Sequence, residues 1–263
     1  MTAGKETVRL SGARTTMLYT LYFRALDSRT EDPLVGDPYA DVVFGRLEGY
    51  NRLLVRLSAG DRYVGLLRAR RIDRMTREYL AAHPDAIVLH LGCGLDSRAL
   101  RLDVPPTVRW YDLDHPEVID IRRRLYPEKE GCRTIGSSVT EAAWLESIPD
   151  DGPVLVIAEG LVMYISEAEV KALFRRLLAK FEHAELIFDV LLPWLTRTTR
   201  LLGWGIDDPK GLEAWDPRLE YVEHTAILLD YPLIPARRYR RAYRLLTRFR
   251  WFGDAFRLLH YRF

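Results

Sequence analysis

The sequence predicts an α/β fold in which a doubly wound parallel β-sheet carries helices on both faces. Short apolar runs of strand length alternate with helical segments after residue 84, and this alternation is typical of parallel sheets. The first run ends in a pair of glycines, which permit a tight turn out of a buried strand. The chain has 263 residues, nearly half of them apolar, and this is enough to bury a sizeable core.

Residues 1–82 are expected to form a helical cap ahead of the sheet. Apolar residues recur at three- and four-residue spacings over residues 16–26 and 40–57, the period of a helix that buries one face. Between these segments, EDPLVGDPYA contains two prolines and a glycine and predicts a loop. A third helix is predicted over residues 61–82, ending before Pro84 because the residue before a proline disfavours the helical conformation.

Residues 83–263 are expected to form the core around the sheet. A helix over SEAEVKALFRRLLAKF opens with a capping box, since Ser166 is followed three residues later by Glu169. A long connection at about residues 193–217 predicts an inserted cap. The predicted strands are residues 86–92, 108–114, 132–138, 153–160 and 184–192, with LEYVEHTAILL and FRLLHYRF as the sixth and seventh.

Composition excludes several classes of protein. No apolar run approaches the roughly 20 residues that span a bilayer, and the first 30 residues lack the apolar region of a signal peptide. The two cysteines, Cys93 and Cys132, form neither a disulfide framework nor a metal-binding spacing. A net charge of +2 argues against nucleic acid as the main partner. We therefore expect a soluble cytoplasmic protein with no metal site and no membrane span.

The C-terminal region is much more basic than the rest of the chain. Residues 232–263 contain nine arginines and one acidic residue, Asp254. This surface could bind an acidic partner, such as a carrier protein or a membrane face. Alternatively, it is a solvated helix face on which arginine stems cover apolar surface.

Polar residues follow three of the predicted strands, where an open parallel sheet binds its ligands. The first strand ends at Gly92 and Gly94, whose backbone can approach a ligand closely. About twenty residues later, the second strand ends in Asp112 and Asp114, where an acid binds the ribose in nucleotide-binding folds. We expect these two aspartates to face opposite sides of their strand, so that only one of them lies at the ligand. The fourth strand ends in Glu159.

The segment after the glycines distinguishes between two nucleotide ligands. The dinucleotide fingerprint has a third small residue where this chain has Ser97. Asp96 lies near the start of the next helix, where its charge would repel a pyrophosphate but not a cationic sulfonium. As a plain N-cap, however, Asp96 is compatible with either ligand. On this ground S-adenosylmethionine is favoured over NAD, and a Rossmann oxidoreductase is the alternative.

Three motifs of the chain resemble the leucine carboxyl methyltransferase family: LGCGLDSRALRL, WYDLDHPEVIDIRRRL and LVIAEGLVMYIS. The segments RALDS, DPLVGDPYA, LRARRID and HYRF resemble its bacterial branch, which includes tetracenomycin-type polyketide O-methyltransferases. The resemblance implies a class I methyltransferase fold, which is Rossmann-like and mostly parallel with an antiparallel last strand. It also implies an N-terminal helical cap and S-adenosylmethionine as cofactor.

The same resemblance implies the cofactor-binding residues. Arg68 would hold the methionine carboxylate, with Arg24 near a second basic position, and Glu159 would lie beside the methionyl amine. Where the family has Asp-Leu near the adenine, this chain has Ser138 and Val139, so we expect altered adenine binding. The complete set of implied cofactor positions is Arg24, Arg68, Gly92, Gly94, Asp114, Ser138, Val139 and Glu159.

The resemblance suggests that the methyl acceptor is a carboxylate of a small, polyketide-like molecule. A carboxylate with a pKa near 4 is ionised at neutral pH, so the reaction needs in-line alignment rather than a base. We therefore expect no firm catalytic residue, although Tyr164 and His115 lie near the site. A phenolic acceptor, with a pKa near 10, would benefit from a base such as His115 or His224. A non-catalytic binding module is a further alternative.

The acceptor is expected to bind between the N-terminal cap and the insertion. Tyr22 of the cap and Trp204 of the insertion could stack on a flat acceptor, and Arg197 or Arg200 could pair with its carboxylate. Alternatively, the tryptophans of the insertion close a core beneath a long connection.

Overall fold

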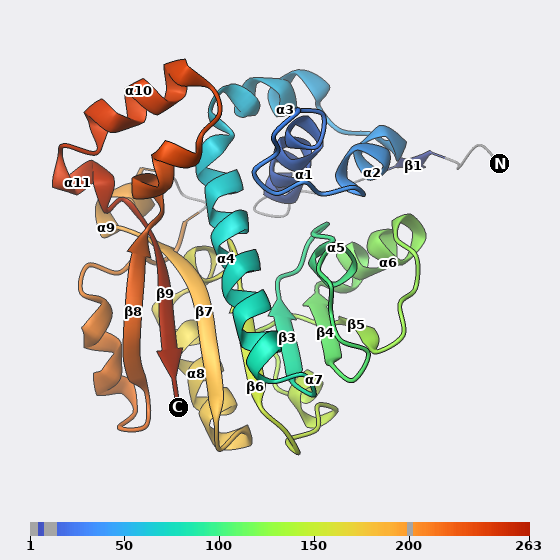
Figure 1. Cartoon of the computed structure of the whole chain (residues 1–263). Coiled ribbons are helices and arrows are strands. Elements are labelled where there is room, and N and C mark those ends of the chain that lie inside the picture. The colour runs from blue at the N-terminus through green and yellow to red at the C-terminus, as the bar shows by residue number, and fades with distance from the viewer. Residues whose placement is uncertain (1–4, 8–14, 199–201) are drawn as a thin grey trace.

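The computed structural model describes residues 5–7, 15–198 and 202–263, and Figure 1 shows their arrangement around one large sheet. Its strand order is β5-β4-β3-β6-β7-β9-β8. All seven predicted strands are present, with ends within three residues of those predicted. They are β3 (Ile87–Leu91), β4 (Arg109–Asp114), β5 (Cys132–Gly136), β6 (Val154–Ala158), β7 (Ala184–Leu191), β8 (Glu220–Ala226) and β9 (Phe256–Arg262).

The sheet is parallel from β5 to β7, and β9 runs antiparallel to both of its neighbours, β7 and β8. The expected mostly parallel sheet with an antiparallel last strand is therefore confirmed. Because the order of the strands reverses at β3, the loops after β3 and β6 diverge there and leave room for a ligand.

Helices cover both faces of the sheet. The helices of the described residues are α1 (Thr16–Asp27), α2 (Ala40–Arg46), α3 (Arg52–Ser58), α4 (Tyr63–Ala82), α5 (Arg98–Arg101), α6 (Pro116–Leu125), α7 (Ala143–Glu146), α8 (Glu167–Lys180), α9 (Pro193–Thr196), α10 (Arg237–Leu246) and α11 (Arg250–Gly253). Short 3₁₀ helices are η2 (Ala59–Asp61), η3 (Val162–Tyr164), η4 (Pro209–Trp215) and η5 (Ile227–Leu233).

Two apolar cores follow from the alternation of side chains along the strands. Val88 and Leu67 of α4 belong to one core, whereas the next strand residue, Leu89, shares the other with Leu177 of α8. Figure 1 shows α4 crossing the front of the sheet and α8 behind it. Successive side chains of a strand thus face opposite helical layers, and the central strands β3 and β6 are buried on both faces.

The N-terminal cap differs from the sequence prediction at one place. The single helix predicted over residues 40–57 is wrong, because the chain forms α2, the two-residue strand β2 (Leu47–Glu48) and then α3. Gly49 has a φ of 82°, which no helix continues through, and Asn51 starts α3 by accepting the Leu54 N–H at 3.0 Å. β2 pairs in parallel with β1 (Glu6–Thr7).

The predicted capping box of α8 is confirmed. The Ser166 side chain accepts the Glu169 N–H at 3.3 Å, and the Ser166 N–H donates to Glu169 Oε2 at 2.7 Å. Of the helices in the described residues, none combines the length and the apolar character that crossing a membrane requires.

Replacing Ser166 with alanine removes the N-cap acceptor of α8, and we expect the free energy of unfolding to fall by about 1 kcal/mol. Urea denaturation followed by circular dichroism measures this change. Ser166→Asp is the matched control, because aspartate caps as well as serine and should keep the wild-type value. A loss of equal size in both variants would contradict the assignment of the cap.

Candidate functional site

A cavity of about 920 Å³ lies where the carboxyl ends of β3, β4 and β6 meet helices α1 and α4. The two candidate catalytic residues, His115 and Tyr164, are part of its wall. The structure also brings together in this wall every position that the sequence matched to a cofactor site: Arg24, Arg68, Gly92, Gly94, Asp114, Ser138, Val139 and Glu159.

The glycine turn after β3 presents backbone to the cavity. Gly92 and Gly94 have φ values of 64° and 51°, a conformation that side-chain-bearing residues rarely adopt. A Cβ added at Gly92 would lie 3.0 Å from the Leu161 side chain, and one at Gly94 would lie 3.2 Å from Met17. A side chain at either position would therefore crowd Leu161 or Met17, which line the same cavity.

Asp114 at the end of β4 is held in place by the turn itself. Its Oδ2 accepts the Gly94 N–H at 2.7 Å, and its Oδ1 accepts the His115 N–H at 2.7 Å. These bonds fix a half-buried carboxylate in the cavity wall. Because each oxygen receives only one of them, lone pairs remain for a ligand.

The expectation that Asp112 and Asp114 face opposite sides of β4 is wrong, because residues two apart on a strand share a face. The two differ instead in depth, since Asp112 lies within β4 and Asp114 at its end. Asp112 is buried, and its Oδ2 accepts from Arg122 Nη2 at 2.5 Å while its Oδ1 lies 3.0 Å from His90 Nδ1. Burial alone would raise the pKa of Asp112, but the Arg122 guanidinium and the bond from His90 lower it to about 2. Asp112 thus holds the neighbouring side chains, and Asp114 is the aspartate in the cavity wall.

Glu159 at the end of β6 is clamped between two arginines. Arg68 Nε donates to its Oε1 at 3.0 Å, and Arg98 Nη2 donates to its Oε2 at 2.6 Å. Burial would raise the pKa of Glu159, yet the guanidiniums of Arg68 and Arg98 lower it to about 2. Arg68 also donates to Asp189 Oδ2 at 2.7 Å, while Asp189 Oδ1 accepts the Gly160 N–H at 2.5 Å. These contacts connect α4 to the ends of β6 and β7.

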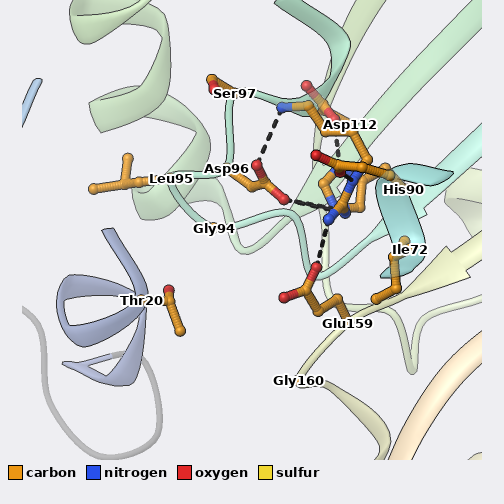
Figure 2. Close-up of polar contacts among 12 residues, drawn as sticks. Thr20, Ile72, His90, Gly94, Leu95, Asp96, Ser97, Asp112, Glu159 and Gly160 are labelled. Atoms are coloured by element: carbon orange, nitrogen blue, oxygen red, sulfur yellow. Dashed lines mark hydrogen bonds and ion pairs between the residues drawn. The ribbon is translucent and has the colours of Figure 1, made fainter. Parts of the chain in front are cut away.

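The role predicted for the charge of Asp96 does not hold. Arg98 Nη1 lies 3.1 Å from Asp96 Oδ2, and Arg101 pairs with the other oxygen. Figure 2 shows the carboxylates of Asp96 and Glu159 facing each other, with dashed polar contacts from both that meet in the space between them. Burial would raise the pKa of Asp96, but Arg101 and Arg98 hold it well below its usual range. Because these arginines compensate its charge, Asp96 gives no electrostatic ground for preferring a sulfonium to a pyrophosphate.

Arg24 reaches the cavity from α1. It is buried, and it donates through Nε to Asp37 Oδ2 at 3.1 Å and through Nη2 to the Leu95 carbonyl at 2.8 Å. These bonds fix α1 over the glycine turn. Further along the wall, the hydroxyl of Ser138 lies 2.8 Å from that of Thr140.

Three predicted substrate residues lie elsewhere in the described part of the chain. Tyr22 stacks on Phe44 with ring centroids 4.7 Å apart. The cavity face of α1 is formed by residues 16, 17, 19, 20, 23 and 24, and position 22 falls beside that face. Trp204 packs on Trp215 at 5.6 Å and on the apolar core. Arg197 is exposed and outside the cavity wall. Arg200 lies outside the described residues.

The far wall of the cavity comes instead from the C-terminal region. Tyr243 of α10, Phe252 of α11 and Phe256 of β9 line it, together with Leu228. Tyr243 donates its hydroxyl to Asp61 Oδ1 at 2.6 Å, which joins residues far apart in the sequence. The only signal for this wall in the sequence was the aromatic residues within the basic tail.

Other buried partners were also missed. Arg98 is fully buried, and Asp73 of α4 accepts from both Arg98 Nε and Arg101 Nη2 at 2.7 Å. Arg98 belongs to the LDSR segment that follows the glycine turn. A charged residue so close to the end of a buried strand was the only sign in the sequence that it has a buried partner. Both cysteines are free thiols. Within the described residues, no histidine, cysteine and acidic side chains are grouped as a metal site requires.

Comparisons with known proteins find relatives that match most of the chain. The model of the leucine carboxyl methyltransferase family matches residues 17–178. Tetracenomycin polyketide synthesis O-methyltransferase of Streptomyces glaucescens is 43% identical over 239 residues, covering 87% of this chain and 88% of that protein. An S-adenosyl-L-methionine-dependent methyltransferase of Gibberella zeae is 35% identical over 260 residues, covering 88% and 87%. The crystal structure of a candidate methyltransferase from Thermobifida fusca shares the fold, with a TM-score of 0.58 at 15% identity over 91% and 93% of the two chains.

Glu159→Gln should destabilise the protein in a pH-dependent way. The folded-state pKa of about 2 lies below the ordinary 4.5, so the charge of Glu159 contributes stability above pH 4.5 that is lost as the pH falls toward 2. We expect the variant to lose a few kcal/mol of unfolding free energy at neutral pH, with a difference from wild type that shrinks on acidification below 4.5.

Urea unfolding over a series of pH values measures this difference. The exposed Glu146→Gln is the matched control and should stay near wild type throughout. A Glu159→Gln deficit that is constant with pH would show that the charge of Glu159 is not what stabilises the cluster.

Proposed function

The chain belongs to the leucine carboxyl methyltransferase family, and we propose that it transfers a methyl group from S-adenosylmethionine to a carboxylate oxygen of a small molecule. The Streptomyces relative is named an O-methyltransferase and the Gibberella relative an S-adenosyl-L-methionine-dependent methyltransferase, and each match covers most of this chain. The observation that carries the proposal is the meeting of the glycine turn, Asp114 and the Arg68–Glu159 pair in one cavity. A polyketide-like acid is the proposed acceptor, in keeping with the name of the Streptomyces relative.

The nucleoside end of the cofactor fits the ends of β3 and β4. Gly92 and Gly94 line the cavity without side chains, so a ligand can lie against the backbone of the turn. The remaining lone pairs of Asp114 suit the two hydroxyls of a ribose. We assign Ser138 and Val139 to the adenine, where the Ser138 hydroxyl takes the place of a carboxylate.

The amino-acid end fits the opposite side of the cavity. Two of the five N–H groups of Arg68 bind Glu159 and Asp189, so the others are available to a carboxylate. Each oxygen of Glu159 accepts one arginine N–H and keeps a lone pair for an ammonium group. Arg68 and Glu159 would therefore hold the two charged groups of the methionine moiety, and we assign Arg24 to positioning α1 over the turn.

S-adenosylmethionine, when bound, supplies a methyl group activated by a positively charged sulfur. The chain itself must orient the acceptor oxygen in line with that methyl group and exclude water. An ionised carboxylate has no proton to lose, so no general base is needed. His90, the buried histidine of the cavity wall, is not placed to act as a base. Its Nδ1 contacts Asp112 and its Nε2 contacts Arg98, so neither ring nitrogen is left for a substrate.

Methylation of a phenolic hydroxyl is the second candidate, and the Asp61–Tyr243 pair favours it. The Tyr243 hydroxyl donates to one oxygen of Asp61, and both residues line the cavity. A carboxylate there would attract a hydroxyl of the acceptor and repel a second carboxylate placed against it. An acceptor that carries both a hydroxyl and a carboxylate could bind with its hydroxyl at Asp61 and its carboxylate facing the cofactor. Such an acceptor would be compatible with carboxylate methylation despite the charge of Asp61.

Calorimetric titration with S-adenosylhomocysteine tests the assigned cofactor site. We expect binding by the wild type and at least tenfold weaker binding by Asp114→Ala, because the ribose loses its acceptor. The exposed Asp120→Asn is the matched control and should bind normally. Binding of NAD in place of S-adenosylhomocysteine would contradict the proposal.

The pH dependence of methyl transfer separates the two acceptor classes. For a carboxylic acid, kcat/KM should be constant between about pH 6 and 9, since the acceptor stays ionised. A rise of about tenfold per pH unit would assign the reaction to a phenolate. Mass spectrometry of the product distinguishes a methyl ester from an aryl ether. Cofactor binding without turnover of either acceptor class would identify a binding module instead.

A further inference from the structure

Large apolar side chains are exposed on α3 and along α10 and α11. Leu57 is 68% exposed and Trp251 is 59% exposed, values far from those of core residues. A cluster of this kind marks an interaction surface more often than a solvated one. Its members are Leu53, Leu54 and Leu57 on α3, and Leu245, Leu246, Phe249 and Trp251 on or between α10 and α11.

The same segments are strongly basic. Residues 52–58 and 237–251 contain nine arginines and no acidic residue. In the part of the chain that the structure describes, none of these nine forms an ion pair, whereas Arg68 and Arg98 each bind two or more carboxylates. Arginine stems that covered apolar surface would leave it buried, but Leu57 and Trp251 remain exposed. A solvated helix face therefore does not account for this region.

The two segments form one surface, which we call the basic face. The Tyr243–Asp61 hydrogen bond joins α10 to η2, directly after α3. The rings of Tyr63 and Tyr239 pack with centroids 4.9 Å apart at the same junction. Figure 1 shows α3 and α10 at the same end of the molecule, beyond the carboxyl ends of the parallel strands.

We propose that the basic face docks onto the surface of an anionic lipid bilayer. Arginines interleaved with leucine, phenylalanine and tryptophan are typical of helices that lie in a membrane interface, with apolar side chains in the acyl boundary and guanidiniums at the phosphates. A second copy of the chain would place arginines against arginines, which opposes self-association through this face. An acidic protein would match the charge, but it would also have to bury seven large apolar side chains.

Docking in this orientation places the cavity next to the lipid. Tyr243 of α10 and Phe252 of α11 line the cavity and belong to the helices that carry the basic face, and Asp61 of the cavity wall lies in η2, directly after α3. An apolar acceptor dissolved in the bilayer would therefore reach the cavity without crossing water. This consequence rests on the proposed methyl transfer, whereas the docking itself is independent of activity.

Vesicle flotation with the full chain tests the docking. Vesicles of phosphatidylcholine and phosphatidylserine in equal parts should bind the protein at least tenfold more tightly than vesicles of phosphatidylcholine alone. Each arginine near an anionic surface contributes about fivefold, so Arg241→Gln with Arg244→Gln should weaken binding about 25-fold. Arg77→Gln with Arg175→Gln removes the same charge from exposed positions of α4 and α8 and should bind as the wild type does.

The apolar contribution has its own readout. Brominated acyl chains should quench tryptophan fluorescence in the wild type, and Trp251→Phe should reduce that quenching while circular dichroism stays unchanged. Binding to vesicles without quenching would overturn the proposal. So would an equal loss of vesicle affinity in the Arg241/Arg244 and Arg77/Arg175 double variants, because binding would then be non-specific charge attraction. So would binding to a purified acidic acyl carrier protein with none to vesicles, or a dimer in sedimentation that is broken by Leu57→Ser and Leu245→Ser.

Discussion

The buried guanidinium of Arg98 is the contact on which the rest of the site depends. It bonds Asp73 of α4, Asp96 of the glycine turn and Glu159 at the end of β6, and thus joins three segments that are distant in the sequence. A buried charge is tolerated only when its donors are satisfied, and removal of one partner leaves the others unpaired at a cost of about 3–5 kcal/mol. The loops at the end of the sheet are therefore held in one arrangement before any ligand arrives, so less conformational entropy is lost on binding.

The strands and the cofactor positions could be predicted because they depend on local patterns. A buried parallel strand such as β3 is a continuous apolar run, and its end is marked by glycines whose backbone conformation few other residues adopt. Asp114 was placed at the ligand by the family motif, and the structure gives the reason: β4 ends at Asp114, which turns toward the glycines. Motif resemblance then supplied Arg68, which no local pattern distinguishes from an ordinary helix arginine.

What could not be predicted are contacts between distant segments. Nothing near Asp189 in the sequence indicates that it accepts from Arg68, and the insertion looked like the outer wall because it is long and aromatic. The structure instead uses Trp204 and Trp215 of the insertion to cover the core, and the cavity takes its outer wall from Tyr243 and Phe252. The break between α2 and α3 was missed because an apolar periodicity can continue through a turn at Gly49 that interrupts the helix.

The position of β9 has a consequence for how the protein is made. β9 is the last strand along the chain, yet it lies inside the sheet and supplies the buried Leu259 and Tyr261 to the core between β7 and β8. A nascent chain that has emerged from the ribosome only as far as β8 has no partner for that strand and leaves the edge of β7 open. Long-range antiparallel pairing of this kind forms late, and an unpaired edge is a site of aggregation. The sheet is therefore completed only after β9 has left the ribosome, and β8 cannot join it before then.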